Sequence, residues 1–180
     1  MLKTPRQIQA FIDALKQAGI ADYNGIFNTF DFSEVNFKDF TSWSDKSYTR
    51  NCLYHDSDFE LILLCWCEGQ ETSVHNHDGE DCWVRILKGE IEEEFFDFNA
   101  EGDLNLLRSQ IVTASETTFI NDEIALHRLK NNFEGRSMSL HLYAKPIEQC
   151  RSYNEANGEF VKKELRYDSE QDVLDGTGTA

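Results

Sequence analysis

The stretch GQETSVHNHDGEDCW, residues 69–83, contains two of the five histidines of this 180-residue chain. In an extended segment, residues two apart project to the same side, so we expect His75 and His77 to point into one space. Two imidazoles placed in this way form part of a chelating site, which a third ligand from elsewhere would complete. The pair alone leaves a second interpretation open, in which both histidines are solvated in an acidic loop.

Segments typical of short β-strands lie on both sides of this stretch. Residues 59–67 (FELILLCWC) form a bounded apolar run, and residues 82–98 (CWVRILKGEIEEEFFDF) indicate two strands that meet near Lys88 and Gly89. Residues 136–144 (RSMSLHLYA) alternate between polar and apolar. Further candidates are residues 109–115, 116–122, 125–131 and 159–167. Many short strands separated by turn residues favour a closed or double-sheeted β architecture over βαβ units.

Two helices are expected before the first of these strands. Thr4 and Pro5 suit the start of the first helix, and Gly19 is expected to stop it. Its apolar stripe consists of Ile8, Phe11, Ile12 and Leu15. The second helix is expected to begin at Ser33. Its buried side consists of Val35, Phe37 and Phe40.

Together these segments predict a single domain that is all-β with N-terminal helices. Residues 1–58 are expected to form a helical segment packed on a β-barrel, and residues 59–167 are expected to form the barrel. The remaining residues, 168–180, are acidic and glycine-rich, so a disordered tail is expected there.

Composition narrows the classes of partner. The formal net charge is −16, and nucleic-acid binding depends on neutralising phosphates with basic residues, so no nucleic-acid partner is expected. No apolar run approaches the roughly 20 residues of a membrane span, so no membrane partner is expected either. Five cysteines, an odd number, together with an N-terminus that lacks the apolar core of a signal peptide, favour a cytoplasmic protein with reduced thiols. We expect a monomer.

The spacing around the two histidines resembles the conserved motifs of the cupin superfamily. Gly69 stands six residues before His75, Gly89 stands seven after Cys82, and His127 is followed by Asn131. The resemblance implies a cupin barrel, also called a double-stranded β-helix or jelly roll. It also implies that His75, His77 and His127 bind a metal. A typical cupin has a glutamate ligand where this chain has Cys82.

Five blocks in the same order make the chain similar to one branch of the cupins, the thiol dioxygenases, and within it to the cysteine dioxygenase family. The blocks are SYTRN (47–51), the CW and EG pairs (65–69), the HxH-to-cysteine spacing (75–82), INDEIALHR (120–128) and SLHLY (139–143). The resemblance implies an Fe(II) enzyme that oxidises the thiol of L-cysteine with O2 to cysteine sulfinic acid. The three histidines by themselves would also suit zinc with a bound water.

Arg50 is the expected binding residue for the substrate carboxylate. A guanidinium binds a carboxylate through two parallel hydrogen bonds and stays charged at any relevant pH. Tyr48 is expected to support the same end of the substrate. Related mercaptopropionate dioxygenases generally lack this arginine, so its presence favours cysteine as the substrate.

The block around residues 139–143 is expected to line the cavity. Period two places Ser139, His141 and Tyr143 on one face, which in isolation also suits the wet face of an edge strand. The resemblance implies a Ser139–His141–Tyr143 relay in which His141 orients the Tyr143 hydroxyl. It also implies a thioether crosslink between Cys82 and Tyr143, where the alternative is an unmodified buried thiol.

Three other functions remain open at this point. The protein could oxidise 3-mercaptopropionate or another small thiol, it could be a non-catalytic cupin that binds a metal, or it could be a zinc hydrolase. The last is disfavoured because no carboxylate has an assigned place as general base. The chain also departs from animal members of the family, which have a Ser-Pro pair, often in a cis peptide, where this chain has Ala144-Lys145-Pro146. We therefore expect a rearranged loop there.

Overall fold

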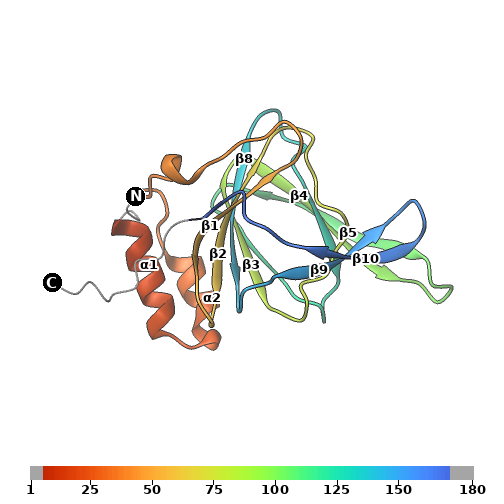
Figure 1. The fold of residues 1–180 in the computed structure, drawn as a ribbon, viewed down its shortest axis with the longest axis horizontal. Helices are drawn as coiled ribbons and strands as arrows, with labels where there is room; N and C mark the ends of the chain where they lie inside the picture. The colour runs from red at the N-terminus through yellow and green to blue at the C-terminus, as the bar shows by residue number, and fades with distance from the viewer. Residues whose placement is uncertain (1–5, 171–180) are drawn as a thin grey trace.

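The computed structural model describes residues 6–170, in which a body of β-strands carries two helices on one side (Figure 1). The helices are α1 (Arg6–Gln17), α2 (Ile20–Thr29) and a short 3-10 turn (Lys38–Phe40). The strands are β1 (Thr49–His55), β2 (Glu60–Trp66), β3 (Cys82–Lys88), β4 (Glu90–Phe98), β5 (Leu104–Thr113), β6 (Thr117–Ile120), β7 (Leu126–Lys130), β8 (Ser137–Tyr143), β9 (Gln149–Asn154), β10 (Glu159–Glu164) and β11 (Ser169–Glu170). Neither α1 nor α2 is long and apolar enough to cross a membrane, and the same holds for the 3-10 turn.

The strands form three sheets. The largest has the order β11-β1-β2-β8-β3-β6, a second has the order β5-β4-β7, and β9 pairs with β10 in a hairpin. Within the described residues these sheets are not hydrogen-bonded into one closed barrel. Apolar residues from the large sheet and from β4, β5 and β7 meet between them in a shared core. The predicted barrel is therefore present as facing sheets, with an interior that the site occupies.

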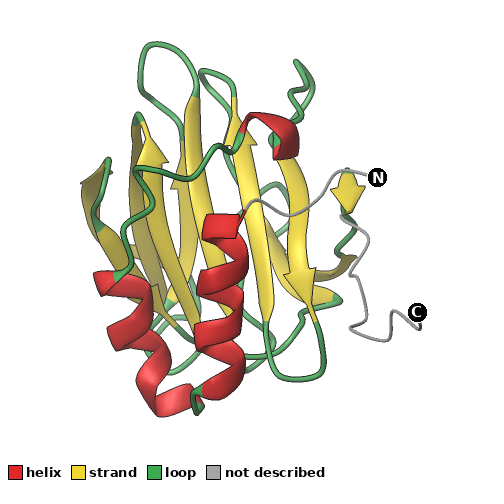
Figure 2. Cartoon of the chain, turned by 90° about the vertical axis from the view of Figure 1, so that its left-hand side faces the viewer, coloured by secondary structure: helices red, strands yellow, loops and turns green. Residues whose placement is uncertain are grey.

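The environment of β2 explains why its sequence is apolar without alternation. Ile62 and Leu64 face the interior, whereas Leu61 and Leu63 face the opposite side. On that outer face lie α1 and α2, which cover the large sheet (Figure 2). Because both faces of β2 are buried, burial favours apolar residues at nearly every position.

The N-terminal segment confirms one predicted helix and corrects the other. The first helix is present with the predicted apolar side buried, while Thr4 and Pro5 lie outside the described residues. The second helix is α2, and not a helix from Ser33. The Asp31 side chain accepts a hydrogen bond from the Ser33 amide, and Asn36 accepts one from the Lys38 amide. Such local bonds compete with helix formation, so this stretch buries its apolar residues without a continuous helix.

Both ends of the predicted barrel region also differ from expectation. Strand β1 belongs to the large sheet, although its residues fall within the segment predicted as helical, and β9 was not predicted. Part of the predicted tail is ordered, because Ser169 and Glu170 pair in parallel with Asn51 and Cys52. Residues 171–180 lie outside the described residues.

Replacement of Gly89 tests the tight connection between β3 and β4. Gly89 has a φ of 72°, and a Cβ atom there would collide with the side chain and backbone of Ser137. We expect Gly89→Ala to lower the free energy of unfolding by about 2–3 kcal/mol, because strain and overpacking add. Gly25→Ala is the control, since a Cβ at this exposed helical position meets nothing within 4 Å. Urea unfolding followed by circular dichroism measures both, and equal effects would contradict the prediction.

Candidate metal centre

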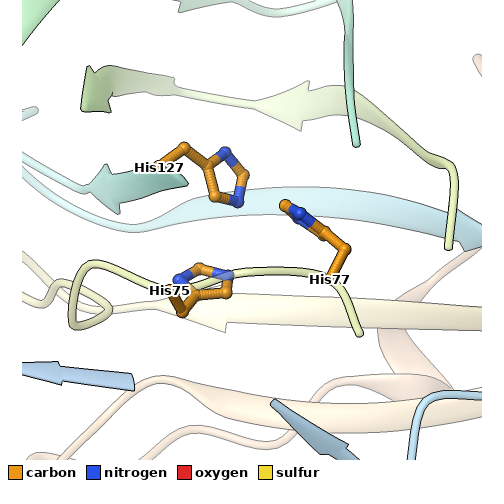
Figure 3. A group of neighbouring side chains, drawn as sticks. All are labelled: His75, His77 and His127. Atoms are coloured by element: carbon orange, nitrogen blue, oxygen red, sulfur yellow. The ribbon is translucent and has the colours of Figure 1, made fainter. Parts of the chain in front are cut away.

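Three histidine rings turn toward a common centre (Figure 3). One ring nitrogen from each of His75, His77 and His127 lies within 4.8 Å of the others. His127 is on β7, and the other two are in the extended segment before β3. The backbones of His75 and His127 exchange hydrogen bonds of 3.0 and 3.1 Å, which fix the two chain segments side by side. The structure thus brings together the three residues predicted as ligands.

An oxygen atom faces the Nδ1 atom of each ring. The three oxygens are the Ser73 carbonyl, 2.9 Å from His75, Asp122 Oδ1, 3.7 Å from His77, and Glu93 Oε1, 3.0 Å from His127. At His75 and His127 this acceptor favours the tautomer with its proton on Nδ1, so the Nε2 lone pair is left for a metal. Both ring nitrogens of the buried His77 lack a hydrogen-bond partner. A buried nitrogen without a partner is costly, and a metal ion would satisfy it.

Burial keeps these rings in the form that binds metals. Burial, reinforced by the neighbouring histidines, lowers the pKa of His77 to about 4 and that of His75 well below its ordinary value. Both imidazoles are therefore neutral at pH 7, as ligation requires. Burial alone would raise the pKa of Asp122, but hydrogen bonds with His77 and Gly79 hold it at about 2. Asp122 therefore stays ionised beside the site.

A cavity adjoins two of the three histidines, His75 and His127. The polar residues that line it include Tyr48, Arg50, His75, His127, His141 and Tyr143, and its apolar wall includes Leu64, Leu129, Ile147 and Leu165. Arg50 is only 8% exposed, and its Nε and Nη2 atoms have no hydrogen-bond partner. A buried guanidinium without a partner anion is unfavourable, so the cavity is suited to a small molecule that carries a negative charge.

The residues predicted as a relay share the inner face of β8, and half of the relay is hydrogen-bonded. The Ser139 hydroxyl lies 2.8 Å from His141 Nε2. The rings of His141 and Tyr143 are nearly parallel at 6.2 Å, with no hydrogen bond between them. Trp66 Nε1 donates to the Ser139 oxygen at 2.9 Å, so the hydroxyl proton is free to point at His141 Nε2. When the hydroxyl donates to Nε2, the proton of the neutral His141 ring is on Nδ1.

Cys82 and Tyr143 are direct neighbours across two strands. Their Cα atoms are partners in the β3–β8 register, and both side chains are buried. Residues paired in this way have Cβ atoms about 5 Å apart. Burial raises the pKa of the Cys82 thiol and the Tyr143 phenol well above their ordinary values, so both groups are protonated at neutral pH.

Several polar residues of the site were not predicted from the sequence. They are Glu93, Asp122 and Trp66, which contact His127, His77 and Ser139 respectively. A signal for Glu93 exists in the sequence, because Ile91 and Phe95 share its face of β4 and are buried. An acid on an otherwise apolar inward face needs a partner inside the protein.

We expect Glu93→Gln to weaken binding of a divalent metal by about 10- to 100-fold, the usual cost of losing a carboxylate behind a histidine ligand. Glu93 is 0% exposed, and its other oxygen accepts from Gln110, so the isosteric amide retains the packing. Chelator competition titration with Co(II) measures the affinity.

Glu92→Gln is the matched control for this measurement. Glu92 precedes Glu93 on the same strand, but its carboxylate accepts from Asn132 at an exposed position. An affinity that is unchanged in Glu93→Gln, or lowered equally in both variants, would contradict a role for Glu93 in orienting His127.

The chain is similar to known proteins along most of its length. A family model described as cysteine dioxygenase type I matches residues 1–156. Cysteine dioxygenase type 1 of Danio rerio is 25% identical over 165 residues, which cover 86% of this chain and 82% of the relative. The human protein of the same name is 25% identical over 175 residues, or 92% of this chain and 88% of the relative.

The fold is also shared with solved structures. A Klebsiella pneumoniae protein with a double-stranded β-helix domain matches 75% of this chain and 100% of its own, with a TM-score of 0.52 and 14% identity. This likeness confirms the predicted double-stranded β-helix, even though the sheets do not close into a barrel. The family match extends from the N-terminus through all three histidines and beyond β8. The chain therefore belongs to the cysteine dioxygenase type I family of enzymes.

Proposed function

We propose that this protein is an Fe(II)-dependent dioxygenase that oxidises the thiol of L-cysteine with O2 to cysteine sulfinic acid. The observation that carries the proposal is the buried guanidinium of Arg50, whose Nε and Nη2 atoms have no hydrogen-bond partner, in the cavity that His75 and His127 line. A carboxylate anchor beside a metal site suits a small amino acid whose other end reacts. The family membership supports the same substrate class.

His75, His77 and His127 would hold the iron. Imidazole ligands carry no charge when they bind a metal, so three of them leave the full charge of a divalent metal and several open coordination positions. When bound, iron(II) supplies the redox chemistry through which dioxygen reacts with a thiol. The donor set alone would also accept zinc, so the choice of iron rests on the family.

Arg50 would bind and orient the substrate through its carboxylate. The Tyr48 ring, which lines the same end of the cavity, stacks on Trp66 at 4.6 Å and is thereby held in place. Two parallel hydrogen bonds from a guanidinium fix both the position and the rotation of a carboxylate. Arg50 thus determines where the thiol of the substrate lies relative to the three histidines.

Tyr143 would donate a hydrogen bond to the negative charge that develops on oxygen during the reaction. Burial raises its pKa, so the hydroxyl proton remains available for donation. The neutral His141 lies against the Tyr143 ring and is itself fixed by Ser139. Donors that are fixed before the reaction stabilise developing charge without reorganisation.

The proposal also includes a cytoplasmic location and a monomeric state. All five cysteines have free thiols, in agreement with a reducing compartment.

The function is tested by anaerobic reconstitution with Fe(II) followed by admission of air and L-cysteine. We expect oxygen uptake that depends on both iron and cysteine, with cysteine sulfinic acid identified by mass spectrometry. The zinc-loaded protein is the control and should not consume oxygen. A panel with 3-mercaptopropionate and cysteamine decides among thiols. Iron binding without oxidation of any thiol would instead support a non-catalytic metal-binding protein.

We expect Arg50→Ala to raise the KM for L-cysteine by about 100-fold, because a charged hydrogen-bonded pair in a buried site is lost. Turnover of cysteamine, which has no carboxylate, should change little. The control is Arg166→Ala, whose side chain is 84% exposed. Oxygen-electrode kinetics measure all three proteins, and an equal loss for both thiols in Arg50→Ala would contradict the assigned role.

We further propose that turnover links Cys82 Sγ to the ring of Tyr143 in a thioether. The register that pairs the two residues supports this proposal. The C–S bond replaces the S–H bond of the thiol and one C–H bond of the ring, and dioxygen takes up the two hydrogens with their two electrons as hydrogen peroxide. We expect a peptide that joins both residues, lighter by two hydrogens than the sum of its parts, to accumulate with turnover. Cys65→Ala, which changes another buried thiol, should leave this product intact. A consistently free Cys82 after many turnovers would refute the crosslink.

A further inference from the structure

A second charged group lies buried behind the wall of the cavity. Glu60 is 0% exposed, and its Cα is the partner of Tyr143 on β8 and of His55 on β1. A carboxylate without hydrogen bonds at such a position would carry a large desolvation penalty. The groups that surround Glu60 must therefore compensate for its burial.

Two groups satisfy the Glu60 carboxylate, and neither is a cation. The Tyr167 hydroxyl donates to Oε1, and the Ile147 amide approaches Oε2 at 3.4 Å. Within residues 6–170, Glu60 forms no salt bridge. The carboxylate is therefore held mainly by a neutral phenol.

Arg50 shares the inner face of the sheet with this carboxylate. In the β1–β2 register Arg50 is the partner of Leu64, and alternation puts Leu64, Ile62 and Glu60 on one side. Burial raises the pKa of Glu60, and the Tyr167 hydroxyl and the positive charge of Arg50 offset part of this rise. Glu60 in turn raises the pKa of Arg50 against the effect of burial. The two charges thus interact without forming an ion pair, while Arg50 Nε and Nη2 have no partner.

The segment that carries Tyr167 is anchored to the strand of Arg50. The Arg50 amide donates to Asp168 Oδ2 at 2.8 Å, and the Asp168 amide donates to the Arg50 carbonyl at 2.8 Å. The Ser169 hydroxyl donates to Asn51 Oδ1 at 2.7 Å. This segment lies beyond residues 1–156, which the family model matches, so Tyr167 is not part of the matched family pattern.

We propose that Tyr167 is a positioning residue, whose hydroxyl holds the Glu60 carboxylate away from Arg50 and so keeps the guanidinium available for the carboxylate of the substrate. The inference rests on the proposed function of the cavity. Without the phenol, the charge that attracts Glu60 most strongly is the guanidinium, since the neighbouring His55 is already bound to Glu170, and a buried ion pair would form between Glu60 and Arg50. The substrate would then have to break that pair in order to bind.

Tyr167→Phe removes only the hydroxyl. We expect it to raise the KM for L-cysteine by about tenfold with kcat little changed, since one charged hydrogen-bond partner must be displaced. Kinetics with cysteamine, which does not need the guanidinium, should stay as in the wild type. Arg166→Ala, in the same segment but exposed, is the control for effects on the segment as a whole.

Rescue by a second substitution separates this role from a structural one. Glu60→Gln has the same shape but no charge, so Glu60→Gln/Tyr167→Phe should regain a KM near the wild-type value. Glu60→Gln alone should leave the KM unchanged or lower it, and this variant tests the inference even if Tyr167→Phe does not fold. A crystal structure of Tyr167→Phe should show Glu60 within 4 Å of Arg50.

The outcomes distinguish the two proposals. A wild-type protein that oxidises no thiol refutes the proposed function, and the crystal structure of Tyr167→Phe then still tests the Glu60–Arg50 contact. An active wild type combined with an unchanged KM in Tyr167→Phe overturns the inference. It is likewise overturned if the double variant shows no rescue, or if Glu60→Gln raises the KM, which would mean that Glu60 orients Arg50.

Discussion

The structure depends on one constraint, which is that polar groups placed between two apolar sheets must find partners there. His127 meets this constraint through Glu93, which in turn accepts from Gln110. Trp66 donates to Ser139, and Ser139 is bonded to His141. In each of these two hydrogen-bonded chains the buried residues satisfy one another, and the histidine at the end of the chain faces the cavity. Apart from the Thr117 hydroxyl, the buried side-chain groups without a partner in the described residues are the ring nitrogens of His77 and the Nε and Nη2 atoms of Arg50, and these nitrogens are the ones that indicate ligands.

The same constraint determines where the negatively charged side chains near the cavity lie. The three histidines are ligands without negative charge, and the carboxylates near them are placed behind the rings. Glu93 and Asp122 face the far sides of His127 and His77, and Glu60 is turned toward a phenol. The anionic thiolate and carboxylate of an aminothiol would thus supply the charge that the protein withholds from the cavity. This distribution explains why a glutamate ligand can be absent without leaving the site incomplete.

The metal site was predictable from the sequence to a greater extent than its surroundings. The resemblance of the spacing around these residues to the cupin motifs implied that His75, His77 and His127 meet, and the structure brings the three together. Local segments predicted most strands and the first helix. The second helix was misplaced because α2 contains Asn and Gly, which are poor helix formers, whereas the side chains of Asp31 and Asn36 bind backbone in a stretch that has helical spacing. Glu93 lies 34 positions from His127 and Glu60 lies 107 from Tyr167, and pairings of that range depend on sheet order that no local pattern contains.

The anchoring of residues 167–169 along β1 has a consequence for the order in which parts of the cavity become available during synthesis. On the ribosome, the chain emerges from its N-terminus, so His75, His77 and His127 leave the exit tunnel well before Leu165, Tyr167 and Asp168. The metal ligands are therefore available to the nascent chain before the segment that pairs with the strand of Arg50. The substrate end of the cavity thus depends on residues that are synthesised later than all three histidines, and the spacing of the histidines does not indicate their contribution.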